Sequence, residues 1–342
     1  MQNLIHKYVK SIAKLCSNNI VTPKISSYEE HDTFYGEKSE YDLCFNVLAH
    51  IQVQTPEICM NMVKAHGYAL KHVHQQTEEI CLAAVKNNGF ALQFVEEQTF
   101  DMCLAAVEQC GLAIQFVKEQ TEEICLTAVR QDGMALKHVL VQTPEICSLA
   151  VKENGIALQF VEEQTFDICL AAVEQCGLAI QFVKEQSEEI CLAAINNNGQ
   201  ALQFVQNQTD VICLAAVQKE GYLLRYVERQ TPEICLAAVH KRGLVLELVQ
   251  EQTDDICLAA VTNAGMALQF VKEQSEEICL AAVKQDGEAL QFVHTQTEKI
   301  CLAAVNSNIY SSVHALKFVN NQTEEICKTV SESLNILFKD YL

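Results

Sequence analysis

The sequence predicts an all-α solenoid in which each 22-residue repeat forms two short helices and the array forms an elongated superhelix. Three observations predict this fold, because a cysteine, a glycine and a polar helix-start signal recur with one period. The cysteine recurs every 22 residues, at Cys59, Cys81, Cys103, Cys125, Cys147, Cys169, Cys191, Cys213, Cys235, Cys257, Cys279 and Cys301. Of the 12 glycines, only Gly36 lies outside the repeat position that runs from Gly67 to Gly287.

The repeat at residues 77–98 shows why a first helix is expected. Thr77 is a suitable N-cap, and Glu78 and Glu79 follow in the first turn, where acidic side chains interact favourably with the helix dipole. Three of the four prolines fall on the first helical position, where no hydrogen bond is lost: Pro56, Pro144 and Pro232. Gly89 is expected to end the helix, because a residue without a Cβ atom adopts a left-handed turn easily.

A second, two-turn helix is predicted from the helical spacing of Ala91, Leu92, Phe94 and Val95. Isolated helices below about 12 to 15 residues are marginal in water, so these helices need neighbours. The Ile-Cys-Leu-Ala-Ala-Val run is apolar almost all round, which predicts a helix sandwiched between two adjacent repeats. The repeats are therefore expected to share one continuous core.

The predicted organisation has four parts. Residues 1–38 form an N-terminal helix, from Met1 to Asn18, and a polar tether, and residues 39–54 form a degenerate half-repeat. Residues 55–322 form the solenoid, and residues 323–342 form a capping repeat whose polar substitutions shield the last layer. The last copy is displaced by the insertion of residues 309–312.

The charge distribution excludes several partners. The chain has a formal net charge of −20, whereas residues 1–38 carry five Lys and four acidic residues, so the solenoid itself is acidic. An acidic solenoid lacks the basic stripe that binds nucleic acid, and it is repelled by anionic membranes. No membrane span or signal peptide is predicted, and we therefore expect a cytoplasmic protein.

The cysteines are predicted to be small buried hydrophobic residues in a reducing compartment. Residues one repeat apart are expected to lie beyond the roughly 7 Å limit for a disulfide. A catalytic cysteine needs a nearby base, and no histidine recurs at a matching repeat position, so we expect no enzyme activity and no cofactor. The additional Cys110 and Cys176 belong to two copies of one duplicated block.

Metal binding is not expected either, because the chain has no C-x-x-C pair. His66, His72 and His74 cluster in one repeat, but residues 72 and 74 do not share a helix face. Solvated histidines are favoured over a metal site there.

A glutamine precedes the helix start in every full repeat, from Gln54 to Gln322. This row could be a polar binding ladder, or each amide could bind the free carbonyls of a helix end. The structural role is favoured, because positions that recognise a partner should vary between repeats.

Variable positions are therefore the candidate partner-facing residues. They include the pairs that follow the last Val of each repeat, the triplets before each Gly, and five side chains of the second helix: Lys71, Gln93, Lys137, Arg225 and Glu247. Sequence drift on a solvated face explains this variation equally well.

The unit T-P/E-E-I-C-L-A-A-V-x-x-x-G-x-A-L-Q-F-V-x-x-Q, as in residues 77–98, resembles a known family. It is similar to a short helical repeat of unknown function, about 22 residues long, that is abundant in mimivirus-like giant viruses of amoebae. The resemblance covers residues 39–330 and implies no activity, cofactor or catalytic residue. A viral source would place the protein in the host cytoplasm.

These observations predict a non-enzymatic scaffold that presents its repeat surface to a protein or peptide partner. The alternatives are a purely structural or assembly protein, and, less favoured, a nucleic-acid-binding or enzymatic module.

Overall fold

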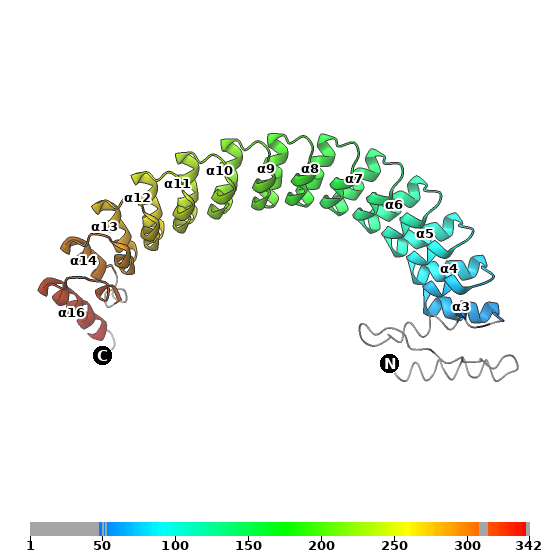
Figure 1. The fold of residues 1–342 in the computed structure, drawn as a ribbon, viewed down its shortest axis with the longest axis horizontal. Coiled ribbons are helices and arrows are strands. Elements are labelled where there is room, and N and C mark those ends of the chain that lie inside the picture. The colour runs from blue at the N-terminus through cyan, green and yellow to red at the C-terminus, as the bar shows by residue number, and fades with distance from the viewer. Residues whose placement is uncertain (1–47, 50, 52, 308–313, 340–342) are drawn as a thin grey trace, which may run out of the picture. The chain divides into compact units, whose positions relative to one another are not determined.

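The computed structural model describes residues 48–49, 51, 53–307 and 314–339 (Figure 1). The predicted helix at Met1–Asn18, the rest of residues 1–38, most of the half-repeat 39–54 and the whole insertion at 309–312 lie outside the described residues. Every regular element of the described part is a helix, which confirms the predicted all-α repeat fold. The chain divides into two compact units, residues 1–141 and 142–342, and this division lies inside the predicted solenoid of residues 55–322.

The two units contain the same alternation of ten-residue α-helices and six-residue 3-10 helices, with shorter or longer helices only at the C-terminal end. In the first unit the elements are α3 (Pro56–Ala65), η1 (Gly67–His72), α4 (Glu78–Asn87), η2 (Gly89–Phe94), α5 (Phe100–Gln109), η3 (Gly111–Phe116), α6 (Glu122–Gln131) and η4 (Gly133–His138). In the second they are α7 (Pro144–Glu153), η5 (Gly155–Phe160), α8 (Phe166–Gln175), η6 (Gly177–Phe182), α9 (Glu188–Asn197), η7 (Gly199–Phe204), α10 (Asp210–Lys219), η8 (Gly221–Tyr226), α11 (Pro232–Lys241), η9 (Gly243–Leu248), α12 (Asp254–Asn263), η10 (Gly265–Phe270), α13 (Glu276–Gln285), η11 (Gly287–Phe292), α14 (Glu298–Val305) and α16 (Glu324–Lys339).

The α-helices begin as the sequence predicts. The Thr77 hydroxyl accepts the backbone N–H of Ile80 at 3.4 Å, and the corresponding Thr or Ser does the same from α3 to α14. Each bond satisfies one of the free N–H groups at a helix start, and removal of such a cap costs about 1 kcal/mol.

The second helix is a 3-10 helix in the repeats that contain η1 to η11, which the sequence did not specify. In the repeat at residues 77–98 the backbone becomes extended at Asn88, with φ −149° and ψ 113°, before η2 starts at Gly89. The Asn88 side chain then accepts the N–H of Phe90 at 3.0 Å. Because 3-10 helices longer than a few residues are uncommon, these six-residue segments depend on packing against their neighbours.

The recurring glycine has a different role from the one predicted. Within the described repeats, no glycine for which neighbours are known has a φ angle in the left-handed region. Instead, the glycine opens the 3-10 helix and touches the α-helix of the next repeat. A Cβ atom on Gly221 would lie 2.6 Å from the Ala238 carbonyl oxygen, and one on Gly287 would lie 2.6 Å from that of Ala304. The prediction of a left-handed cap was therefore wrong, and close backbone approach explains the glycine.

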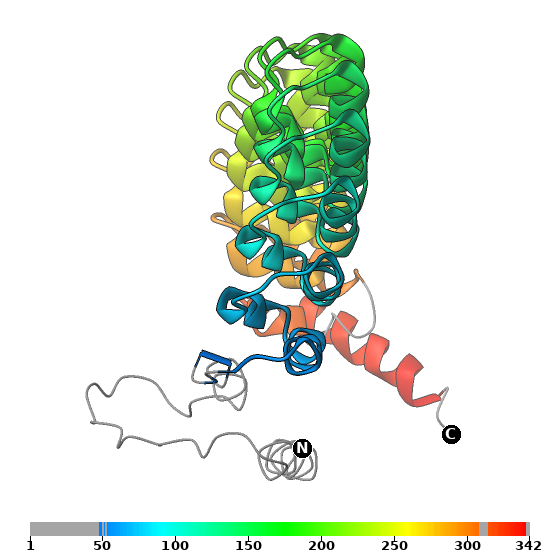
Figure 2. The same ribbon diagram turned by 90° about the vertical axis from the view of Figure 1, so that its right-hand side faces the viewer.

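Each unit is built from two layers. Within a unit, the α-helix of one repeat packs on the α-helix of the next, and the 3-10 helices pack on each other in the same way (Figures 1 and 2). Seven positions form the core between the layers in every repeat from residue 77 to residue 296, and in the repeat at residues 77–98 they are Ile80, Cys81, Ala84, Val85, Ala91, Leu92 and Val95. Full burial of one Leu or Ile side chain contributes about 1.5 to 3 kcal/mol.

The α-helix is sandwiched between the α-helices of the two adjacent repeats, as its apolar run predicts, but it is not buried on all sides. In α4, Leu82 and Ala83 are half-buried, while Ile80, Cys81, Ala84 and Val85 are buried. The helix therefore keeps one face toward solvent, and that face carries apolar side chains.

Candidate interaction surfaces

The recurring glutamines form a structural ladder. In this glutamine ladder the Nε2 atom donates to the last carbonyl of the next 3-10 helix, and the Oε1 atom accepts the N–H two residues later. For Gln164 these bonds reach Phe182 O at 2.9 Å and Lys184 N at 3.0 Å. Twelve glutamines make both bonds: Gln54, Gln76, Gln98, Gln120, Gln142, Gln164, Gln186, Gln208, Gln230, Gln252, Gln274 and Gln296. The structural interpretation is confirmed, because these amides bond backbone groups of the next repeat.

The triplet before each glycine contains a second structural row, which sequence reasoning missed. The side-chain oxygen of its middle residue accepts the glycine N–H of the preceding repeat, as Asn263 does from Gly243 at 2.7 Å. Seven residues make this bond: Asn87, Gln109, Gln131, Gln175, Asn197, Asn263 and Gln285. The frequent Asn or Gln at this place was the available signal.

The third residue of the triplet also has a local role. Five of these residues accept an N–H from the start of the 3-10 helix: Asn88, Asp132, Asn154, Asn198 and Asp286. The first residue of each triplet is a variable, exposed position at the end of the α-helix. In α10 and α11 the second and third residues of the triplet are exposed as well: Lys219, Glu220, Lys241 and Arg242.

The five predicted partner-facing side chains all lie exposed at the fifth position of a 3-10 helix: Lys71, Gln93, Lys137, Arg225 and Glu247. Two of them bind their own helix. Gln93 Nε2 donates to the Phe90 carbonyl at 3.0 Å, and Arg225 Nε donates to that of Tyr222 at 3.2 Å, with its guanidinium 5.1 Å from the Tyr222 ring centre. Their role in partner binding stays a prediction. The structure shows a second candidate interaction surface.

That second surface is the solvent-facing side of the α-helices, here called the α-face. Its centre is a row of half-buried leucines, at Leu82, Leu104 and Leu126 in the first unit and at Leu170, Leu192, Leu214, Leu236, Leu258, Leu280 and Leu302 in the second. Met60 occupies this position in α3, and Ser148 occupies it in α7. The following residue is Ala in most of these helices, and this small side chain leaves room beside each leucine.

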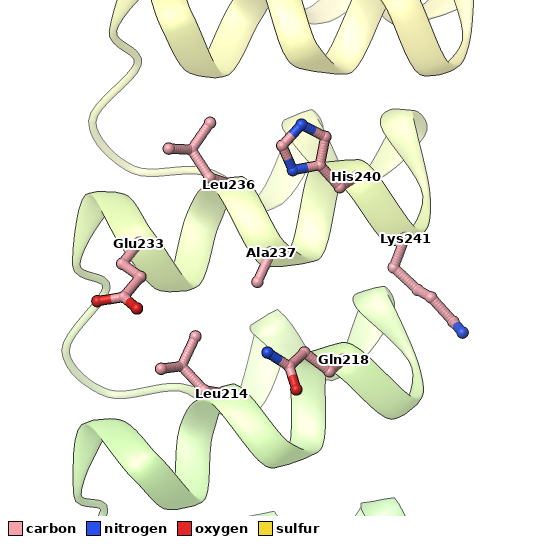
Figure 3. A pocket seen from close by; sticks show the side chains of 7 residues that line it. All are labelled: Leu214, Gln218, Glu233, Leu236, Ala237, His240 and Lys241. Atoms are coloured by element: carbon pink, nitrogen blue, oxygen red, sulfur yellow. The ribbon is translucent and has the colours of Figure 1, made fainter.

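A shallow cleft of about 500 Å³ lies on the α-face between α10 and α11. Figure 3 shows Leu214 and Leu236 at equivalent places on the two helices, with Gln218 and His240 at equivalent places nearer the helix ends. Glu233, in the first turn of α11, also lines the cleft. Lys241 lines the opposite end of the cleft (Figure 3). One cleft thus combines an apolar floor with an acidic side chain at one end and a basic side chain at the other.

Burial disfavours the thiolate form of the repeat cysteines. All described cysteines are free thiols, and the repeat cysteines from Cys59 to Cys301 are buried, which confirms their predicted reduced, buried state. Burial raises the pKa of the Cys81 and Cys213 thiols to about 11, with smaller contributions from nearby carboxylates, those of Asp210 and Glu228 in the case of Cys213. The Cys213 thiol is therefore protonated at neutral pH, and it lies 3.7 Å from the Gln208 amide oxygen.

These raised pKa values predict a loss of stability in alkaline solution. Between about pH 9 and pH 11 the unfolded chain releases the thiol protons while the folded chain retains them, so the unfolding free energy falls as the pH rises. Urea unfolding measured from pH 8 to pH 11 should show this decline, and Cys213→Ala should make it shallower. An unfolding free energy that is independent of pH across this interval would contradict the assignment.

Other groups that could hold a ligand are few in the described residues. Among them, no set of three or more His, Cys, Asp or Glu side chains is arranged to hold a metal ion. His66 ends α3, and its ring lies 6.1 Å from that of Tyr68. No helix in the same part of the chain combines the length and apolar character needed to cross a bilayer.

Among known proteins, a family of repeats without an assigned activity matches this chain. No curated protein and no solved structure matches the chain. A family model matches residues 55–100, 99–142, 121–166, 143–187, 165–208 and 254–296, so that most matches span about two repeats and together they cover more than half of the 342 residues. The chain therefore belongs to the family described as Domain of unknown function (DUF4116).

Proposed function

We propose that this protein is a non-enzymatic scaffold that binds a protein or peptide partner on its α-face. The observation that supports the proposal most strongly is the row of half-buried leucines, because Leu recurs on a solvent-facing side where helix formation alone does not require an apolar residue. Contiguous exposed apolar surface on a soluble domain is typical of a binding site.

The hydrogen bonds that recur from repeat to repeat also favour the α-face as the binding surface. The glutamine ladder and the row of Asn and Gln residues before the glycines are occupied by bonds between repeats. The α-face leucines make no such polar contact, and the first residues of the triplets beside them differ from helix to helix: Lys152, Glu174, Asn196, Gln218, His240, Thr262 and Lys284 in the second unit. An apolar row with variable polar neighbours combines affinity with selectivity.

Two other classes of function receive less support. Catalysis by the recurring cysteine is disfavoured because burial keeps the thiol protonated. Nucleic acid and anionic membranes are disfavoured as partners because acidic residues outnumber basic ones by 44 to 24. A cytoplasmic location, in the host where the source is viral, stays a prediction.

Site-specific photo-crosslinking tests the proposal. Benzoylphenylalanine placed at Gln218, on the α-face, should give a discrete covalent adduct in an extract of the source cells, because that side chain is exposed and lines the cleft. The same group at Arg225, on the 3-10 layer, should give none. Adducts from position 225 alone would move the binding surface to the 3-10 helices, and no discrete adduct from either position would contradict a scaffold role.

A further inference from the structure

The carboxylates at the helix starts along the α-face of the second unit indicate what kind of molecule this surface binds. The first turns of α9 to α13 carry eight exposed carboxylates, here called the acidic edge: Glu188, Glu189, Asp210, Glu233, Asp254, Asp255, Glu276 and Glu277. Every one of these five helices contributes at least one carboxylate. The acidic edge thus runs beside the leucine row without a gap.

The acidic edge is almost free of neutralising cations. Among the described residues, the one ion pair that includes it joins Lys299 Nζ to Glu276 Oε1 at 3.2 Å, and Lys299 belongs to α14, just beyond the edge. The Thr209 hydroxyl donates to Glu188 Oε2 at 3.1 Å, which is a neutral contact. The other carboxylates are exposed to solvent and available to a positively charged partner.

The helix dipole accounts for an acidic residue at each helix start, but it does not account for the leucine beside it. Positions three and four apart share a helix face, and Glu233 lines the same cleft as Leu236 and Ala237. A molecule that lies along the Glu233 end of this cleft meets a carboxylate and an apolar floor together, while Lys241 lines the opposite end. It therefore needs cationic and apolar side chains in alternation along its length.

The spacing of the repeats suggests the form of such a molecule. Packed helices lie about 8 to 10 Å apart, so the carboxylates recur at roughly that interval across the α-face. An extended polyproline II segment advances about 3.1 Å per residue with three residues per turn, which returns every third side chain to one side after about 9 Å. A peptide with a cationic side chain at every third position would then place one cation beside the carboxylates of each successive helix.

We infer that the α-face of α9 to α13 binds an extended basic peptide segment, with a Lys or Arg at every third position on the acidic edge and apolar side chains over the leucine row. This inference rests on the proposed scaffold function. It identifies the partner by its chemistry, as a cationic and apolar stretch of another protein.

Fluorescence anisotropy with synthetic peptides tests the inference on the full chain. The probe is an 18-residue peptide of six Lys-Pro-Leu triplets, so that the spacing of its cations follows the repeat. The comparison peptides are one with the same composition but with the lysines grouped at one end, and one of six Glu-Pro-Leu triplets. The spaced basic peptide should bind more tightly than the grouped one, and the acidic peptide should not bind. Raising the salt from about 0.05 M to about 0.3 M should weaken binding, because exposed charges become screened.

Two matched variants locate the binding surface. The triple variant Glu189→Gln, Glu233→Gln, Glu277→Gln removes three charges from the acidic edge and should weaken binding about tenfold, since each exposed ion pair contributes modestly. The control variant Glu220→Gln, Glu247→Gln, Glu288→Gln removes the same charge from the C-terminal end of α10 and from η9 and η11, and should change binding less than about twofold. Circular dichroism of both variants checks that they fold.

Several outcomes would overturn the inference. It fails if the grouped or acidic peptide binds as tightly as the spaced basic one, or if both triple variants lose affinity equally, since net charge alone would then explain binding. These results differ from a failure of the proposed function. A crosslinked partner at position 218 without a basic segment would refute the inference and keep the scaffold, whereas the absence of any adduct refutes the scaffold.

Discussion

Replacement of Gln164 by Ala should lower the unfolding free energy by about 2 to 4 kcal/mol. It should leave partner binding at the α-face unchanged. The side chain bonds two backbone groups of the next repeat, the Phe182 carbonyl and the Lys184 N–H, and it accepts the Cys169 thiol at 3.6 Å. Each backbone group left without a partner costs about 1 to 3 kcal/mol. The Lys184 N–H lies in an exposed turn where water replaces the amide in part, so its contribution falls at the lower end.

The matched control is Gln159→Ala in the same repeat. Gln159 is exposed, and its amide donates only to Ile156 of its own 3-10 helix, at 3.1 Å. Its replacement should change the unfolding free energy by less than about 0.5 kcal/mol, as expected for an exposed position. Urea unfolding of the three proteins measures the difference. Equal midpoints for Gln164→Ala and the unsubstituted chain would show that the glutamine ladder does not hold the repeats together.

Gly265→Ala should destabilise the protein by about 3 kcal/mol or more. A Cβ atom at this position would lie 2.5 Å from the Ala282 carbonyl oxygen and 2.9 Å from the Asp286 Cβ atom. Both atoms belong to the next α-helix or its end, so the substitution forces two repeats apart. Overpacking of a well-filled interior typically costs 1 to 3 kcal/mol, and a backbone contact cannot relax by rotation of a side chain, so the loss reaches about the upper end of that range.

Gly199→Ala is the control that the chain itself provides. A Cβ atom there would first meet the Leu223 Cδ1 atom at 2.5 Å, and its next neighbours lie 3.8 Å away. Because a leucine side chain can move at a cost of about 0.5 to 1.5 kcal/mol, this variant should lose less stability than Gly265→Ala. Differential scanning calorimetry of both variants compares them. An equal loss at the two sites would favour a shared backbone requirement, as in a left-handed cap, over close approach.

The positions of the α-helices could be predicted because their signals are local. Thr77 before Glu78 and Glu79, and Pro56 at a first helical position, determine where a helix begins through bonds and dihedral angles within a few residues. The role of the glutamines was also accessible, because a residue that recurs without variation beside a helix end is expected to serve structure. The structure then identified its partners in the next repeat.

The candidate site was predicted less well. Lys71, Gln93, Lys137, Arg225 and Glu247 were selected by variability alone, and variability does not report which polar groups meet across a repeat boundary. The α-face was missed because Leu214 and Leu236 were interpreted only as part of a helix sandwiched between two adjacent repeats. Hydrophobicity identifies a side chain that can be buried, but the number of neighbouring layers decides whether it is.

The sequence by itself determined the 22-residue period, the all-α class, the helix starts and the burial of the reduced cysteines, since these follow from local chemistry repeated many times. Only the tertiary structure decided that the second helix is a 3-10 helix, that Gly221 is needed for contact with Ala238, and that a leucine row stays open to solvent. The physical reason is that these features depend on the distance and orientation of the next repeat. Each of them depends on how segments about 20 residues apart pack together, and local propensity does not encode where such segments meet.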